Sequence, residues 1–327
     1  MPRSNDQKGY VDPVLSHLAL DYAATALKGL AGSKIFPTVP VPKKDARYAV
    51  FSKNNAVLEG STRLSDNGDV PRRVSMEQGY AFVNADDYGL MQTVDEADAQ
   101  MMEGAFSNAK QRAVRNLTRK LILDEEVRAR ELLKTLPSGH KANLSGDGTG
   151  KNNQWSGSGG DPVAKITEIA KGMYVQPNVL VLGRDVMFAL RENAALKDAV
   201  KNVVTSGNPL LIDESLLSHV FRIPNVHVAQ PFHFGHEKKT GAGAPSYIWD
   251  GLVFLGYVAE SPGADDLTFG ARFAVDYPQA GANGWMVSRW FDHAPGVRGA
   301  ETIKVSGSFE YKIMSPDCGH LLTGVVA

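Results

Sequence analysis

The sequence predicts an α+β protein, and three observations support this fold class. The stretch from Val94 to Leu136 contains no proline and a single glycine, and its apolar residues recur every three or four positions. This spacing indicates one long amphipathic helix. A segment rich in charges and turn residues precedes the helix and is typical of a projecting β-hairpin. Short strands and helices alternate after the helix, and from Leu267 onward the chain is mostly β.

Composition excludes several classes of protein. The chain has 327 residues and a formal net charge of -1, so it does not bind nucleic acid as a polycation would. Its single cysteine, Cys318, cannot form an internal disulfide, which fits a reducing cytoplasm. The N-terminus lacks the apolar run of a signal peptide, and no stretch approaches the ~20 apolar residues that span a bilayer. We therefore expect a soluble protein with no membrane partner.

The first 42 residues are expected to form an arm. Apolar residues from Val14 to Leu30 have helical spacing and predict a short helix. Pro37, Pro40 and Pro42 follow, and proline cannot donate a hydrogen bond to a neighbouring strand. This part of the arm should therefore be extended and lie outside the centre of any sheet.

Residues 43–92 are expected to form a long hairpin. Strand-like runs occur at 47–52 and 55–64, and the turn residues Asp66, Asn67 and Gly68 follow. An isolated two-stranded hairpin is marginally stable in water, and this one has too few apolar residues for a core of its own. Its length therefore suggests a partner molecule on which it lies.

The long helix is predicted to begin at a capping box formed by Thr93 and Glu96 and to end at Pro137. At ~1.5 Å per residue it would span about 60 Å, more than one ordinary domain. A coiled coil, or two helices broken near Gly104 or Asp124, remains the alternative. The face opposite the apolar stripe carries basic residues, namely Lys110, Arg115, Arg119 and Lys120.

A loop rich in glycine and serine follows, and then a compact α/β unit. Pro162 in the first turn supports a helix at 161–175, and a short apolar run predicts a buried strand at 177–183. A further helix is expected at 184–201. Further strands are expected at 219–230, 247–260, 267–275, 284–292 and 300–314, before an apolar end at 318–327.

The sequence contains no motif with the spacing expected of a catalytic, cofactor-binding or metal-binding site. The GDGTGK run near Gly150 lacks the phosphate-loop spacing, and Cys318 has no nucleophile context. Two pairs of neighbouring acids, Asp86–Asp87 and Asp265–Asp266, should point to opposite faces of a strand and are interpreted as solvated turns. A further cluster lacks metal-ligand spacing and is interpreted as a surface loop; it comprises His227, His233, His236 and Glu237.

The order of these segments resembles the major capsid proteins of tailed double-stranded-DNA bacteriophages, which have the Hong Kong 97-type fold. The stretches QPNVLVLGRDVMFALRENAALKDAVK and GSFEYKIMSPDCGHLLTGVV carry the resemblance locally. The resemblance implies six parts: an N-terminal arm (1–42), an extended loop (43–92), a peripheral domain with a spine helix (93–160), an axial domain (161–262), peripheral strands (263–310) and a C-terminal return to the axial domain (311–327).

The resemblance also implies the function. The protein would not be an enzyme but would assemble as hexamers and pentamers into an icosahedral virion shell in the cytoplasm of the host bacterium. Its partners would be further copies of itself, packaged double-stranded DNA through non-specific contact, a portal and a decoration protein. No segment of ~100 residues that could act as scaffold precedes the arm, so we expect a separate scaffolding protein to guide assembly, with guidance by the arm as the alternative.

The hairpin charges would then make contacts between subunits. The basic face of the helix would either line the inner surface or bind acids of a neighbouring subunit. The expected contact residues are Glu59, Arg63, Asp66, Asp69, Arg72, Arg73 and Glu77. An ordinary solvated hairpin is the alternative interpretation of these charges. An encapsulin-type compartment shell, or a soluble α/β enzyme or ligand-binding protein, is the alternative for the whole chain.

Overall fold

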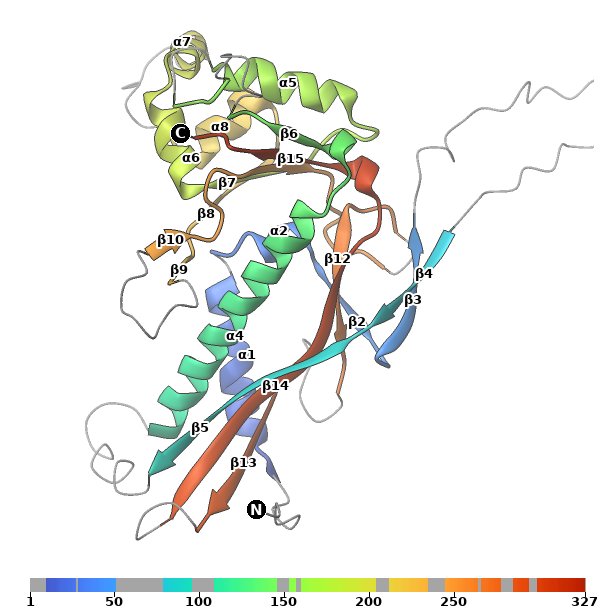
Figure 1. Cartoon of the computed structure of the whole chain (residues 1–327), viewed down its shortest axis with the longest axis vertical. Coiled ribbons are helices and arrows are strands. Elements are labelled where there is room, and N and C mark those ends of the chain that lie inside the picture. Colours follow the sequence, from blue (N-terminus) through green and yellow to red (C-terminus); the bar gives the residue numbers. More distant parts are fainter. Residues whose placement is uncertain are drawn as a thin grey trace, which may run out of the picture.

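The structure, a computed structural model, describes most of the chain. The described residues are 10–27, 29–50, 79–95, 109–145, 153–156, 160–203, 212–234, 245–263, 266–277, 285–293 and 299–326. Figure 1 shows a unit of helices over a small sheet at one end, a long helix leading away from it, and a second, elongated sheet beside that helix. Within these ranges no helix is both long and apolar enough to cross a membrane.

The elongated sheet is built around one long strand, β14. Its six strands are β1 (Tyr10–Val11), β2 (Thr38–Val41), β5 (Asp86–Asp95), β12 (Gly270–Val275), β13 (Trp285–Asp292) and β14 (Ala300–Ile313). Phe309 of β14 pairs with Ala274 on one side and Asp86 on the other, and Val305 pairs with β13 and β5 in the same way. Strands β12 and β13 therefore lie end to end along one edge of β14, opposite β5.

The proline-rich part of the arm lies at the edge of this sheet, as its sequence predicts. Strand β2 contains Pro40 and runs parallel to β12. Only β12 pairs with β2 among the described strands, so the missing N–H of proline interrupts no ladder on the outer side.

Two helices cover one face of the elongated sheet: α1 (Pro13–Leu27) and α4 (Ala109–Lys134). Their apolar faces meet the inward residues of β13 and β14 in one buried cluster. The predicted stripe is confirmed over its second half, since Ala109, Ala113, Leu117 and Leu121 are all buried there.

The predicted start of the long helix is wrong. Val94 and Thr93 belong to β5, and Thr93 pairs with Thr302 of β14, with their hydroxyl oxygens 3.2 Å apart. The proposed capping box therefore cannot exist, because strand pairing overrides the helical spacing of residue 94. The described helix has 26 residues, or about 39 Å. It continues without a break through Asp124, whereas Gly104 lies outside the described residues.

The second unit is a five-stranded sheet with helices on both faces. Its strands, in spatial order, are β6 (Lys141–Asn143), β15 (Gly319–Thr323), β11 (Val253–Gly256), β7 (Val179–Gly183) and β8 (Asn225–Ala229). Residues of β7 alternate between two cores. Leu180 and Leu182 face α5 (Pro162–Gly172), α6 (Arg184–Glu192), α7 (Ala194–Val203) and α8 (Glu214–Phe221). Val179 and Val181 face α2 (Gly32–Ile35) and the C-terminal half of α4.

Two predictions in this unit need correction. The single helix expected at 184–201 is two helices, because Asn193 ends α6 and its side-chain nitrogen donates to the carbonyls of Trp155 and Gly160. The strand expected at 219–230 begins only at Asn225. Helix α8 occupies the preceding residues and ends at Arg222, which adopts a left-handed conformation with φ of 57°.

The base of the predicted hairpin is confirmed. Strand β3 (Asp45–Val50) pairs with β4 (Gly79–Asn84), and Figure 1 shows the pair rising away from the elongated sheet. The predicted strand at 55–64 and the turn at Asp66 lie outside the described residues. A second, small hairpin joins β9 (Phe232–Phe234) to β10 (Pro245–Tyr247). Two short 3-10 helices complete the described elements, η2 (Ser138–His140) and η3 (Pro316–Cys318).

Candidate functional surfaces

A buried carboxylate of α4 joins three parts of the chain. The Glu126 side chain is almost fully buried, and its Oε1 accepts hydrogen bonds from the amides of Ala31 and Gly32 at 2.8 and 3.1 Å. The same oxygen accepts a bond from the indole N–H of Trp249 at 2.6 Å. Glu126 therefore ties the arm and the five-stranded unit to the long helix.

The environment of Glu126 shifts its titration. Burial raises the pKa of Glu126 to about 7, although the bonds from Trp249, Gly32 and Ala31 oppose this rise. A β-carbon on Gly32 would lie 2.7 Å from Glu126 Oε2. The close approach of the arm to this carboxylate therefore requires glycine at position 32.

The neighbouring acid, Glu125, forms a second buried junction. Its carboxylate pairs with Arg272 of β12 at 2.9 Å and accepts a bond from the Tyr311 hydroxyl of β14 at 3.1 Å. Burial, followed by the charge of Glu125, raises the pKa of Tyr311 well above its usual value. The guanidinium also lies 4.6 Å from the centre of the Phe309 ring. This junction fixes the long helix to the centre of the elongated sheet.

Sequence reasoning missed both junctions. Two adjacent acids inside an otherwise apolar helical stripe were the available signal, because a buried charge needs a partner. Nothing in the sequence identifies Arg272 or Trp249 as that partner.

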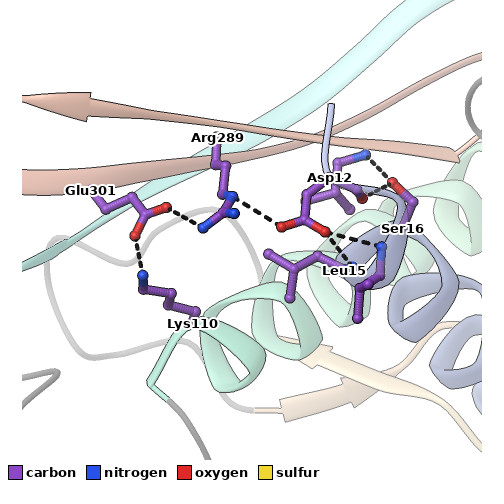
Figure 2. Close-up of polar contacts among 8 residues, drawn as sticks. Asp12, Leu15, Ser16, Lys110, Arg289 and Glu301 are labelled. Carbon is purple, nitrogen blue, oxygen red and sulfur yellow. Dashed lines mark hydrogen bonds and ion pairs between the residues drawn. The ribbon is translucent and has the colours of Figure 1, made fainter. Parts of the chain in front are cut away.

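A chain of ion pairs holds the far end of the elongated sheet (Figure 2). Asp12 caps α1 by accepting bonds from the Val14 and Leu15 amides at 3.0 and 3.1 Å. Its other carboxylate oxygen lies 2.9 Å from Arg289 of β13. Glu301 of β14 pairs with Arg289 at 3.1 Å and also with Lys110 of α4 at 2.5 Å. Lys110, predicted on the inner surface, thus serves first to join the helix to the sheet.

The other predicted basic residues of α4 are exposed. Arg115, Arg119 and Lys120 lie on the solvent side of the helix, opposite the buried Leu117 and Leu121. Arg115 and Arg119, four positions apart, share one stripe of the helix, whereas Lys120 points to a different side and Lys110 is paired with Glu301. Whether they face a shell interior stays a prediction.

An apolar surface lies along β4 and β5. Phe82 of β4 is 67% exposed and Met91 of β5 is 69% exposed, and Tyr80 and Leu90 are also exposed. Arg47 of β3 lies over the Phe82 ring, with its Cζ 5.0 Å from the ring centre. We call these four residues, Tyr80, Phe82, Leu90 and Met91, the hairpin surface. Leu90 and Met91 are consecutive in β5, so their side chains point to opposite faces of the strand. Large apolar side chains exposed on both β4 and β5 indicate that another molecule covers parts of this ribbon.

The predicted contact charges of the hairpin lie outside the described residues. They are Glu59, Arg63, Asp66, Asp69, Arg72, Arg73 and Glu77, and their role stays a prediction. The acids at its base are described. Asp86 and Asp87 are in β5 rather than in a solvated turn, since Asp87 contacts Lys44 and the Ser308 hydroxyl. The bond from Lys44 lowers the pKa of Asp87.

The histidine-rich segment is only partly described. His227 lies in β8 rather than in a surface loop, and burial lowers its pKa. His236 and Glu237 lie outside the described residues. Within the described ranges, no three histidine, cysteine or acidic side chains are grouped so as to hold a metal ion.

Comparison with known proteins shows which proteins share this architecture. No protein-family model matches the chain. Over 321 residues the chain is 23% identical to the major capsid protein of Pseudomonas phage JBD67, covering 97% of each protein. It is similar in structure to a phage-related protein from Bordetella bronchiseptica RB50, with a TM-score of 0.71 and 18% identity over 98% of this chain and 99% of that one. The capsid structure of cyanophage P-SCSP1u gives a TM-score of 0.55 at 11% identity, over 88% and 86%.

These likenesses confirm the fold that the segment order predicts. The chain has the Hong Kong 97-type fold of phage capsid proteins. Over nearly its whole length it is similar in sequence to a phage major capsid protein in particular.

Proposed function

We propose that the chain is the major capsid protein of a tailed bacteriophage and that it assembles, as hexamers and pentamers, into an icosahedral shell around double-stranded DNA. The observation that carries this proposal is the full-length similarity to a phage major capsid protein, joined to a fold that leaves a hairpin projecting from the body. A hairpin with exposed aromatic residues is unstable alone, and a neighbouring subunit would cover it.

The internal junctions suit a subunit of this kind. Helix α4 is anchored at Glu125 to the elongated sheet, at Glu126 to the five-stranded unit and the arm, and at Lys110 to the far end of the elongated sheet. The subunit is therefore stiff along its length, and the surfaces that contact neighbouring subunits stay at fixed distances from one another. Individually weak contacts, repeated on several sides, give a stable closed shell because each bound copy raises the effective concentration of the next contact.

The proposal extends to partners and location. The shell would form in the cytoplasm of the host bacterium and become part of the virion. A separate scaffolding protein would guide its closure, a portal would occupy one vertex, and a decoration protein would bind the outside. Support for these partners comes from the fold class and from the similarity to a phage capsid protein.

The size of the purified protein in solution and its appearance in electron micrographs test the proposal. We expect material far larger than the 35.3 kDa chain on size-exclusion chromatography, and closed shells or rings of five and six in electron micrographs. A stable monomer, with residues 43–90 folded onto its own body, would refute it. Small shells that hold protein and no DNA after expression in the phage host would instead indicate an encapsulin-type compartment.

The predicted hairpin contacts have their own test. Arg72 and Arg73 should pair with acids of the adjacent subunit, so the double variant R72E/R73E should assemble poorly while the unassembled chain stays folded. Shell yield by sedimentation and secondary structure by circular dichroism are the two measurements. Normal particles from the double variant would show that these charges are an ordinary solvated face.

A further inference from the structure

Two of the connections between the elongated sheet and the five-stranded unit run side by side. Helix α4 leads through η2 into β6, and β14 leads through η3 into β15 (Figure 1). Strands β6 and β15 are parallel, and Lys141 pairs with Leu321. This register places His140, the last residue of η2, beside His320 of β15. A contact between η2 and η3 therefore acts on both connections at once.

One contact joins η2 to η3 directly. Nε2 of His140 lies 3.5 Å from Oδ1 of Asp317, and the two side chains are partly shielded, with 26% and 17% of their surface exposed. This separation is longer than an ordinary N–H···O hydrogen bond of about 2.7–3.2 Å. A neutral imidazole therefore gains little from the carboxylate, whereas a charged imidazole is attracted to it. Histidine is the side chain that ordinarily changes between these two forms near neutral pH.

The charged groups around this pair come from α5, β6 and β15. A cavity of about 440 Å³ borders the pair, and three further titratable side chains line it, namely Lys165 and Glu168 of α5 and His320 of β15. Lys165 and Glu168 pair with each other at 2.9 Å. Lys141 of β6 points back towards α4, because its Nζ donates to the carbonyl of Lys134 at 2.9 Å. The acid that contacts the η2 imidazole is therefore Asp317.

The second histidine of the cavity responds to a proton in the opposite way. Burial lowers the pKa of His320 from 6.5, and the positive charges of His140 and Lys165 lower it further. Its Nε2 is buried and has no hydrogen-bond partner among the described residues. The folded chain therefore holds a proton on His320 less tightly than the unfolded chain does. As a result, His320 lowers the free energy of unfolding as the pH falls below 6.5.

We propose that His140 and Asp317 form a proton-operated clasp between the two connections. A proton on the imidazole closes the clasp, because the charged ring is drawn to the carboxylate, and η2 then holds β6 against β15. Loss of the proton opens it, and the five-stranded unit is then tied less firmly to the elongated sheet. The clasp does not rest on the proposed function, since it concerns contacts within a single chain.

Hydrogen exchange of the purified full-length chain tests the clasp. Protection of the amides of β6 and β15 is measured by mass spectrometry at pH 5.5 and pH 8, on either side of the ordinary titration of histidine, and is corrected for the intrinsic exchange rate at each pH. At pH 5.5, H140Q should lower protection by up to about five-fold, the size expected of a partly exposed ion pair, and should do so in the wild type but not in D317N. At pH 8 it should change protection in neither background.

The matched control is H219Q, because His219 is an exposed histidine on α8 of the same unit. It should match the wild type at both pH values. Glu126 also titrates in this range, but it is present in every variant and cancels in the comparison.

Four results would overturn the clasp. H140Q could have no effect at pH 5.5, or an equal effect at both pH values. Its effect could also persist in D317N, or H219Q could reproduce it. The measurement needs no shell, so an absence of shells in electron micrographs would contradict the proposed function and leave the clasp standing.

Discussion

Three consecutive acids of α4 have three different environments. Asp124 is exposed and pairs with Arg128 one turn later. Glu125 and Glu126 are buried, the first against Arg272 of β12 and the second against Trp249 in the turn before β11. The charge of Glu125 is balanced by a guanidinium. Glu126 accepts hydrogen bonds from N–H donors alone, so its ionised form is hydrogen-bonded but remains in a poorly solvated place. Two glutamates within one helical turn can therefore differ in their effect on stability, because one is paired with a positive charge and the other is not.

Glu126 should make stability depend on pH. Its pKa is raised from 4.5 to about 7 in the folded chain, so between these values the folded state binds more protons than the unfolded state. The free energy of unfolding should therefore fall as pH rises through this window, by at most about 1.4 kcal/mol per pH unit from this group. The stability is fully present below pH 4.5 and is lost above about pH 7.

The variant E126Q isolates this effect. Glutamine cannot ionise, so urea unfolding of the unassembled chain at pH 5, 6 and 7 should show a smaller loss of stability with rising pH than in the wild type. D124N removes a neighbouring exposed carboxylate and serves as the control, which should retain the wild-type trend. Parallel curves for E126Q and the wild type would contradict the assigned role of Glu126.

At the scale of single residues, the sequence predicts few of the contacts that the structure shows. It places Glu125 and Glu126 on the predicted helix, but burial of each depends on Arg272 and Trp249, which lie more than a hundred residues away. The exposed positions of Arg115, Arg119 and Lys120 could be predicted, since they depend only on helical spacing. The engagement of Lys110 by Glu301 could not.

Elements were predicted well where their signal is local. Strands β12, β13 and β14 and helix α5 fall within the expected ranges, because each has a local apolar pattern or a cap. The predicted start of α4 was wrong. The spacing of apolar residues at 86–95 suits either a strand or a helix, and pairing with β14 makes this segment a strand. The break at Asn193 failed as well, because it depends on distant carbonyls of Trp155 and Gly160.

Helix α1 offers an element-level prediction. Asp12 both caps the helix and pairs with Arg289, whereas Asp161 caps α5 through the amides of Val163 and Ala164 and forms no ion pair with the described residues. D161A should cost about 1 kcal/mol, the usual value of a cap. D12A should cost about 0.5–1 kcal/mol more, from the lost ion pair.

Urea unfolding at two salt concentrations checks this comparison. The excess cost of D12A over D161A should shrink in 1 M salt, because salt screens the partly exposed pair with Arg289. An excess that does not change with salt would show that the ion-pair chain of Figure 2 contributes no electrostatic stability.

At the scale of the whole molecule, the hairpin surface should matter only after assembly. The variant F82S/M91S removes two side chains that are 67% and 69% exposed, so the unassembled chain should keep its unfolding midpoint. Shell yield by sedimentation should fall several-fold, because a weakened interface on every copy is repeated throughout the lattice. N84S, at an exposed polar position of β4, is the control. Wild-type yields from F82S/M91S would exclude this surface from the subunit interfaces.

Strand β15 has a consequence for how the chain is made. It lies between β6 and β11, and Val325 just beyond it is fully buried, yet it is the last described strand to leave the ribosome. Until then β6 and β11 lack their shared neighbour, and the unit cannot close. A polypeptide that stops before Gly319 would thus leave the facing edges of β6 and β11 unpaired and the core of this unit open to water.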